Sequence, residues 1–234
     1  MQARGTLEVA WLATVDYAAA LELQEAMVAA RFKELIGDTL LLLEHPHVFT
    51  MGRGADDRYL FREIPGVPVF RVSRGGQVTY HGPGQLVGYP ILKLEGSERD
   101  VHAYLRALEL AMIDALAKFG IRGERRAGLT GVWVGERKIG SIGVGIRRWV
   151  TLHGFALNVC PELGYFDAMV PCGVAGCEMT SMEHEGAGAS VPATRAAVIE
   201  SFAALFGYRR VADADARRLW TLVGSRAAGR EAQP

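Results

Sequence analysis

The sequence has little cysteine and no long hydrophobic run. Its three cysteines are an odd number, and a chain of 234 residues buries enough surface to fold without disulfide bonds. No apolar segment approaches the roughly 20 residues that a membrane-spanning helix needs. Glu8 interrupts the short apolar run near the start, so no secretory signal is recognisable. These absences argue against a disulfide framework, a secreted protein and a membrane protein, and they favour the cytoplasm.

An excess of charge of either sign is also missing. Lysine and arginine total 26, as do aspartate and glutamate, so nothing suggests the basic field of a nucleic-acid-binding protein. Four common motifs do not occur: the phosphate loop G-x-x-x-x-G-K-S/T, the dinucleotide fingerprint G-x-G-x-x-G, the zinc motif H-E-x-x-H and the nucleophile elbow G-x-S-x-G. The chemistry therefore has to come from a less common arrangement of residues.

What is present is the composition of a globular α/β protein, with 50% hydrophobic and 22% charged residues. Apolar runs and helical periodicity predict alternating strands and helices. We expect strands at 7–14, 39–43, 48–51, 67–72, 86–94, 132–134, 137–146, 150–159 and 177–182, and helices at 17–35, 101–119, 191–206 and 213–222. We assign residues 1–223 to a single domain and residues 224–234 to a flexible tail.

The segment of residues 74–85, RGGQVTYHGPGQ, stands out by its four glycines and one proline. Glycine lets a backbone turn through positive φ or lie directly against a ligand. The segment is therefore either a tight hairpin with surface glycines or one wall of a binding site. The residues of this segment alone leave both interpretations open.

Lys138 occupies an unusual place for a lysine. A regular strand would put it on an apolar face with Ile142, Val144 and Ile146. An ammonium group there loses hydration unless it reaches solvent at the strand end or finds an anion. The opposite face of the strand consists of one serine and two glycines, so a helix or a ligand must fill the space beside it.

Cys172 is the best candidate nucleophile, because Pro171 and Gly173 place it on a sharp turn where backbone N–H groups can face a carbonyl. Cys160 and Cys177 adjoin strand-like runs and are expected to be packed thiols. A zinc site is disfavoured, since Cys172 and Cys177 are too far apart for a C-x-x-C pair and no H-x-E precedes them.

A nucleophilic cysteine needs a partner that favours its thiolate. Lys138 is the candidate, either as an ammonium beside a thiolate or as an amine that accepts the thiol proton. His45 and His47 could suggest a metal site. The sequence argues against it, because the two side chains flank Pro46 and point apart and no third ligand is suitably spaced.

Five segments together resemble the lipoyl(octanoyl) transferases. The strongest resemblance is RGGQVTYHGPGQLVGYP at 74–90, supported by EHPHVFT at 44–50, KIGSIG at 138–143, HGFALN at 153–158 and PCG at 171–173. They follow one another in order over most of the chain. The resemblance implies an α/β (α+β) fold of the biotin/lipoate protein ligase type, with a mixed, largely antiparallel central β-sheet flanked by α-helices.

The same resemblance implies that Cys172 forms an octanoyl thioester and that Lys138 activates it. It also implies fourteen substrate-binding residues: Arg74, Gly75, Gly76, Gln77, Val78, Thr79, Tyr80, His81, Ser141, Ile142, Gly143, Gly154, Phe155 and Ala156. The donor would be octanoyl-acyl carrier protein, and the acceptors would be lysines of the lipoyl domains of 2-oxoacid dehydrogenases and of the glycine cleavage H protein. A thioester is already activated, so neither ATP nor a metal is expected, and the family pattern implies a monomer without nucleic acid or membrane partners.

Two alternatives remain at this point. An ATP-dependent lipoate or biotin ligase has the same fold and needs no catalytic cysteine, and a non-catalytic acyl-binding protein would use the glycine-rich segment merely to hold a chain. The PCG segment argues against the ligase. We further hypothesise that arginines steer an acidic carrier protein, the candidates being Arg122, Arg125, Arg126, Arg147 and Arg148.

Overall fold

The computed structural model describes residues 4–173 and 176–231. Its centre is an eight-stranded sheet with the strand order β11-β1-β2-β6-β10-β9-β8-β7. The first three strands in this order run parallel, and all the other neighbours are antiparallel. The prediction of a mixed, largely antiparallel sheet is confirmed. The strands are β1 (Arg4–Thr14), β2 (Thr39–Glu44), β6 (Gln85–Ile91), β7 (Glu124–Arg126), β8 (Leu129–Val134), β9 (Arg137–Arg147), β10 (Val150–Asn158) and β11 (Tyr208–Asp213).

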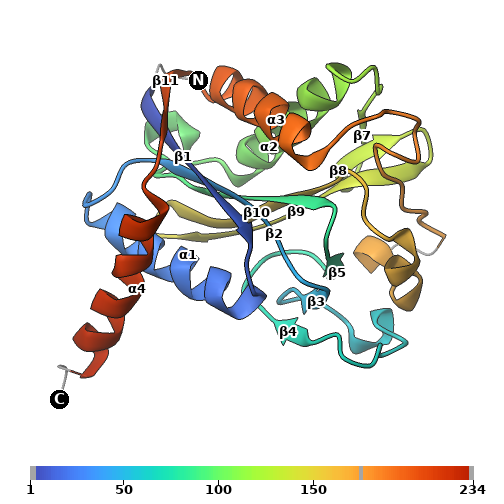
Figure 1. Cartoon of the computed structure of the whole chain (residues 1–234), viewed down its shortest axis with the longest axis horizontal. Helices are drawn as coiled ribbons and strands as arrows, with labels where there is room; N and C mark the ends of the chain where they lie inside the picture. The colour runs from blue at the N-terminus through green and yellow to red at the C-terminus, as the bar shows by residue number, and fades with distance from the viewer. Residues whose placement is uncertain (1–3, 174–175, 232–234) are drawn as a thin grey trace.

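Helices cover both faces of this sheet (Figure 1). α2 (Val101–Ala117) and α3 (Val191–Leu205) pack together on one face, over a core that reaches from Leu7 to Phe206. α1 (Tyr17–Phe32) and α4 (Ala216–Glu231) lie on the other face, over a second core. The sheet is thus buried on both sides, which explains why β2 and β6 read as continuous apolar runs.

A second, three-stranded sheet lies against the face that carries α1 (Figure 1). It consists of β3 (Val48–Met51), β4 (Val69–Arg71) and β5 (Val78–His81) in the order β4-β3-β5. The glycine-rich segment supplies β5 and the loop before it. Short 3₁₀ turns complete the chain: η1 (Asp57–Tyr59), η2 (Gly96–Glu98), η3 (Leu163–Ala168) and η4 (Pro171–Gly173).

The structure differs from the predicted elements in several places, and the short strands β5 and β7 were not among the expected strands. Residues 177–182 form no strand and contribute only an isolated bridge between Met179 and Lys138. β11 was missed because an edge strand with only Tyr208 buried lacks an apolar pattern. α4 continues past Gly224 to Glu231, and residues 232–234 lie outside the described part, so the domain boundary at 223 stays a prediction.

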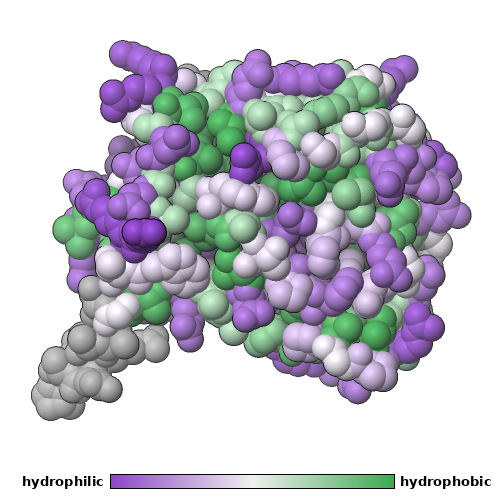
Figure 2. Space-filling model, viewed as in Figure 1, coloured by the Kyte–Doolittle hydropathy of each residue, from purple (hydrophilic) through white to green (hydrophobic). Residues whose placement is uncertain are grey.

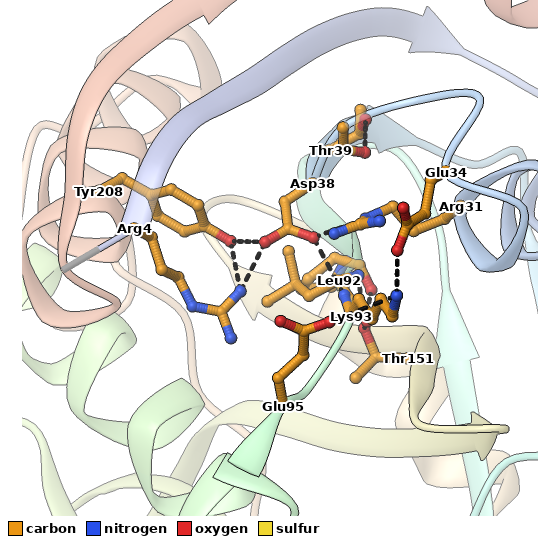
Figure 3. A network of polar contacts seen from close by, with 12 residues as sticks. Arg4, Arg31, Glu34, Asp38, Thr39, Leu92, Lys93, Glu95, Thr151 and Tyr208 are labelled. Atoms are coloured by element: carbon orange, nitrogen blue, oxygen red, sulfur yellow. Dashed lines mark hydrogen bonds and ion pairs between the residues drawn. The ribbon is translucent and has the colours of Figure 1, made fainter. Parts of the chain in front are cut away.

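A polar network fastens the sheet edge to the ends of the helices (Figure 3). Its hub is Asp38, whose carboxylate accepts hydrogen bonds from the side chains of Arg4, Arg31 and Tyr208. The backbone N–H of Lys93 donates to the same carboxylate at 3.0 Å. Arg4 also pairs with Glu98, which ties β1 to the segment before α2. The network joins segments that are far apart in the sequence.

On the molecular face shown in Figure 2, polar and apolar side chains are interspersed. Within 4–173 and 176–231, no helix combines the length and the hydropathy that crossing a bilayer requires.

Candidate active site

A cavity of about 300 Å³ lies between the glycine-rich segment and the strands β9 and β10 of the large sheet. Lys138 lines it. So do twelve of the substrate-binding residues implied by the resemblance: Arg74, Gly76, Gln77, Val78, Thr79, His81, Ser141, Ile142, Gly143, Gly154, Phe155 and Ala156. The structure thus brings together residues from three separate sequence segments. The hairpin interpretation is too narrow, because the segment is a strand and loop that close over a cavity.

Gly75 and Tyr80 do not line this cavity. Gly75 donates its backbone N–H to the carbonyl of Val144 at 2.9 Å, which fixes the loop on β9. The side chain of Tyr80 is fully buried in another cluster, stacks on Tyr165 and hydrogen bonds His47 Nδ1 at 2.7 Å. Strand alternation explains this position, since Thr79 and His81 point to the opposite side from Tyr80.

The loop before β5 fills the empty face of β9. A Cβ atom on Gly143 would lie 2.8 Å from Arg74 Cδ and 3.1 Å from the Gly75 carbonyl oxygen. Only glycine therefore allows this close approach. The small-residue face of β9, which was expected to be covered by a helix or a ligand, is therefore covered partly by this loop and partly by the cavity.

Arg74 holds the loop in place from inside. Its buried guanidinium donates to the carbonyl and hydroxyl oxygens of Thr50 at 2.7 and 2.8 Å, and to the carbonyls of Gly75 and Gln77 at 3.0 and 2.9 Å. These bonds tie the loop to β3. The guanidinium thus organises the backbone that forms one wall of the cavity.

Lys138 is 1% exposed, so it does not reach solvent at the strand end. Its Nζ donates to the carbonyl of Thr130 at 2.9 Å and lies 5.5 Å from the ring centre of Trp133. The prediction that Lys138 shares a face with Ile142 is wrong, because β9 carries a bulge. Val132 pairs with Gly140 while Trp133 pairs with Lys138, which leaves Ile139 as an extra residue. The bulge turns Lys138 to the cavity side, whereas Ile142 packs against the core and only borders the cavity.

The backbone of Lys138 is clamped by the segment that follows η4. Its N–H donates to the carbonyl of Glu178 at 2.8 Å, and its carbonyl accepts from the N–H of Thr180 at 2.9 Å. Its position is therefore fixed by backbone bonds as well as by burial.

A chain of buried side chains extends this clamp to the glycine-rich segment. Asn158 Nδ2 donates to the Thr180 carbonyl at 2.9 Å, and Gln85 Nε2 donates to Asn158 Oδ1 at 2.9 Å. His81 Nδ1 lies 2.6 Å from Gln85 Oε1, and because an amide oxygen only accepts, this nitrogen carries the proton. Residues of three motifs thus support Lys138 without contacting the cavity themselves, apart from His81.

Three buried histidines lie at the cavity or next to it: His81 and His153 line it, and His45 packs against the lining residues Tyr17, His81 and Tyr89. Burial lowers the pKa of His45 and of His153 to about 4 and that of His81 to about 3, with further lowering of His81 and His153 by the Arg74 charge. All three are neutral at pH 7. His45 Nδ1 donates to the Val15 carbonyl at 2.6 Å, so its Nε2 accepts from the hydroxyl of Tyr89 at 2.7 Å.

These contacts bear on the metal interpretation of His45 and His47. Both nitrogens of His45 are engaged by protein groups, and His47 bonds Tyr80 instead. Among the residues that the structure describes, no three histidine, cysteine or acidic side chains gather as a metal site. The expectation that the protein needs no metal or ATP stays a prediction.

Several lining residues were not singled out from the sequence, including Tyr17, Tyr89, Thr130, His153 and Met169. Tyr89 and His153 belong to the motif segments that carried the resemblance, so their positions within a motif could have predicted that they line the cavity. His153 also has a positive φ of 57°, which is uncommon for a residue other than glycine. Tyr17 gave no signal, since a tyrosine at the start of a helix is ordinary.

Cys172 belongs to η4, directly after Pro171, which lines the cavity. Its side chain lies outside the described part of the structure. The prediction that Cys160 and Cys177 are packed is wrong, because Cys160 is exposed and Cys177 is half-buried. Cys160 follows the end of β10, and Cys177 lies in the segment 177–182, which does not form the predicted strand. Partial burial and the nearby Glu183 and Glu44 raise the pKa of Cys160, which disfavours its thiolate.

Comparisons with known proteins agree with this arrangement. The lipoyl protein ligase A/B catalytic domain family matches residues 16–203. The octanoyltransferase of Solibacter usitatus (strain Ellin6076) is 52% identical over 202 residues, which cover 84% of this chain and 91% of that protein. The chain belongs to the octanoyltransferases. The octanoyltransferase of Gloeobacter violaceus is 48% identical over 194 residues, covering 82% of this chain and 87% of that one.

Solved structures of lipoate protein ligases share the fold of this octanoyltransferase. A putative lipoate protein ligase from T. acidophilum with bound lipoic acid superposes with a TM-score of 0.72 at 17% identity, over 93% of both chains. Lipoate-protein ligase A bound with ATP gives 0.72 at 17% identity, over 96% of this chain and 94% of that one. The family resemblance and the fold class predicted from the sequence are confirmed.

Proposed function

We propose that this octanoyltransferase takes an octanoyl group from acyl carrier protein, holds it as a thioester on Cys172, and passes it to a lysine of a lipoyl domain. As a member of its family the protein is an acyltransferase that moves octanoyl groups in protein lipoylation. The donor, the covalent intermediate and the pairing of Cys172 with Lys138 are the parts that we add.

The observation that carries the proposal is the position of the Lys138 amine. It is a buried amine in a cavity that also has Pro171, the neighbour of Cys172, in its wall. The volume of about 300 Å³ is at the low end of the range for small-molecule sites and fits a short acyl chain. Small residues and backbone along β9 and β10 leave room for that chain.

The reaction has two acyl transfers. The Cys172 sulfur attacks the thioester carbonyl carbon, the bond to the phosphopantetheine sulfur breaks, and the departing thiolate takes up the proton that the Cys172 thiol has lost. The neutral amine of the acceptor lysine then attacks the Cys172 thioester. An amide forms, the Cys172 sulfur leaves, and the amine proton returns to it. Lys138 stabilises the thiolate in both steps, as ammonium beside it or by holding the proton.

The test is to incubate the protein with octanoyl-acyl carrier protein without ATP and to measure its intact mass. We expect one octanoyl group in place of one hydrogen, located on the peptide that contains Cys172. Cys172→Ala should abolish the adduct. Cys177→Ala is the matched control, because this cysteine lies five positions further along, and it should leave the adduct unchanged.

Three results would contradict the proposal. If the wild-type protein forms no adduct, the covalent mechanism is wrong. If octanoate is activated only when ATP is added, the ligase alternative applies instead. An adduct that survives Cys172→Ala would move the nucleophile to Cys160 or Cys177.

A further inference from the structure

Glu109 is a carboxylate in the middle of helix α2 whose side chain is completely buried. It lies beside Leu108 and Met112 of the apolar core. Burying a carboxylate costs several kcal/mol unless hydrogen bonds and opposite charges compensate. An apolar side chain would meet the packing need at this position without that cost, so the charge itself has a use.

The two oxygens of Glu109 have different partners. Oε2 lies 2.6 Å from Arg106 Nη1 and 3.5 Å from Arg125 Nε, and both arginines reach the surface. Oε1 turns inward and accepts the backbone N–H of Gly131 at 3.0 Å. The inner oxygen therefore contacts strand β8 at the residue that follows Thr130.

The N–H of Gly131 and the C=O of Thr130 are the two ends of one peptide group. In a trans peptide they point in opposite directions. Glu109 bonds the N–H end, and the Lys138 amine bonds the C=O end at 2.9 Å. A carboxylate, a single peptide group and a lysine thus form a continuous line from the helix to the cavity.

We propose that Glu109 is a positioning residue that acts on Lys138 through the Thr130–Gly131 peptide group. The inference rests on the proposed function only in taking Lys138 as the partner of Cys172. A carboxylate at the N–H end polarises the peptide and strengthens the hydrogen bond at its carbonyl. The carbonyl thereby holds the amine more firmly and favours its charged form.

The packing around Gly131 makes this coupling tight. Gly131 has a φ of 127°, and a Cβ atom there would lie 2.6 Å from Lys138 Cε and 2.9 Å from Nζ. The lysine side chain therefore rests directly on this peptide. A displacement of the Thr130–Gly131 segment has to move the amine with it.

In the described part of the structure, Arg106 of α2 and Arg125 of β7 face Glu109, and the ring of Trp133 faces Lys138. Arginine keeps its charge throughout the accessible pH range. A change in pH dependence after mutation of Glu109 therefore reports on Lys138 and Cys172.

The first experiment uses Glu109→Gln, which keeps an oxygen for Gly131 and removes the charge. We expect kcat to fall roughly tenfold with KM little changed, and the pH midpoint of Cys172 alkylation by iodoacetamide to rise by about one unit. Asp114→Asn is the matched control. It removes another carboxylate of α2, which contacts Ser201 and not β8, and both quantities should stay at wild-type values.

The decisive comparison is made in the Lys138→Ala background. There Glu109→Gln should leave the alkylation rate and its pH midpoint unchanged, because the amine through which Glu109 acts is gone. An equal effect in both backgrounds would overturn the proposal, as would a Glu109→Gln enzyme that behaves like Asp114→Asn. Failure of the proposed function is a separate result, namely the absence of a wild-type octanoyl adduct.

A second measurement keeps the inference testable if Glu109→Gln does not fold. In Lys138→Met the amine is replaced by an uncharged side chain of similar length. We expect the amide proton of Gly131 to move upfield in the NMR spectrum more than that of its neighbour Val132, whose N–H does not bond Glu109. Equal shifts of the two protons, or none, would overturn the proposal.

Discussion

Asn158 lies directly opposite Gln85 in the sheet, and the two side chains form a hydrogen bond of 2.9 Å between strands that are 73 positions apart in the chain. Asn158 also donates to the carbonyl of Thr180, whose own N–H holds the backbone of Lys138. The asparagine and glutamine of two sequence motifs therefore support the backbone of Lys138 from behind. Neither side chain lines the cavity.

Asn158→Ala should lower both stability and turnover. It leaves the Gln85 amide and the Thr180 carbonyl without their partner, and a buried group that loses its hydrogen bond costs about 1–3 kcal/mol. We expect a lower urea midpoint and a reduced kcat, measured on the same preparation. Thr180→Ala is the control, since it keeps the backbone clamp and removes only the bond to Glu185. Equal losses of kcat in both variants would contradict this account.

Gly131→Ala should reduce both activity and stability. The new methyl group would lie 2.5 Å from the Gly140 carbonyl oxygen of β9, and it would also occupy the space of the Lys138 side chain and displace the amine from the Thr130 carbonyl. Gly135→Ala is a suitable comparison, because Gly135 also has a positive φ but nothing lies within 4 Å of the added atom. Both variants carry a backbone strain of about 1–3 kcal/mol. We expect only Gly131→Ala to lose Cys172 acylation, and a loss in both would refute the explanation.

Stability should fall as the pH is lowered from about 6.5 to about 4. The unfolded chain binds protons at its histidines from about pH 6.5 downward, whereas burial lowers the folded pKa of His45 and His153 to about 4. The unfolded state thus binds more protons in this window, and each pH unit costs up to about 1.4 kcal/mol per histidine. Above pH 6.5 the contribution of these histidines is constant.

The measurement for this prediction is urea unfolding of the wild type and of His153→Asn at pH 7.5, 6 and 5. Asparagine tolerates the positive φ of this position and does not titrate. The variant should lose less stability between pH 7.5 and pH 5 than the wild type does. Parallel curves for the two proteins would show that His153 does not contribute.

Asp38→Asn should destabilise the fold and leave the chemistry intact. The carboxylate is 11% exposed and pairs with Arg4 and Arg31, so its neutralisation removes this charge partner from Arg31 and leaves Arg4 with Glu98. Breaking a buried pair costs about 3 kcal/mol or more. We expect a lower Tm with normal Cys172 acylation at low temperature. Glu136→Gln should leave Tm unchanged, because the Glu136 side chain is 93% exposed in its ion pair with Arg126.

Three of the five arginines proposed from the sequence as a docking surface have acidic partners within the chain. Arg125, Arg126 and Arg147 each lie within 4 Å of a glutamate of their own chain. Their field is therefore partly neutralised, and the steering of a carrier protein by these arginines stays a prediction.

Most of the fold was predictable because local patterns agree with it. Helix α2 was found from its apolar periodicity and from Asp100, whose carboxylate accepts the N–H of Ala103. β2 and β6 were predicted from their continuous apolar runs, which arise because both strands are buried on two faces. β11 escaped because its pairing with β1 is decided by tertiary structure and leaves no trace in its own six residues.

The candidate site was predictable in its residues but less so in its geometry. The bulge at Ile139 reverses the side to which Lys138 points, and no single sequence reveals a bulge of this kind. Tyr80 stands inside the motif yet points away from the cavity, because a strand alternates its side chains. Glu109 escaped notice, since a glutamate on an amphipathic helix is normally on the solvent side.

The cavity has one wall in each of the two sheets. Its inner wall is β9 and β10 of the large sheet, and its outer wall is β5 with the loop that Arg74 anchors to β3. Separation of the small sheet therefore opens the site while both apolar cores stay folded. An acyl chain that bridges the two walls binds only the docked form, so occupancy and docking are thermodynamically linked. Amide hydrogen exchange in β3 and β5 should then slow when the acyl chain is bound, whereas exchange in β2 is governed by global unfolding.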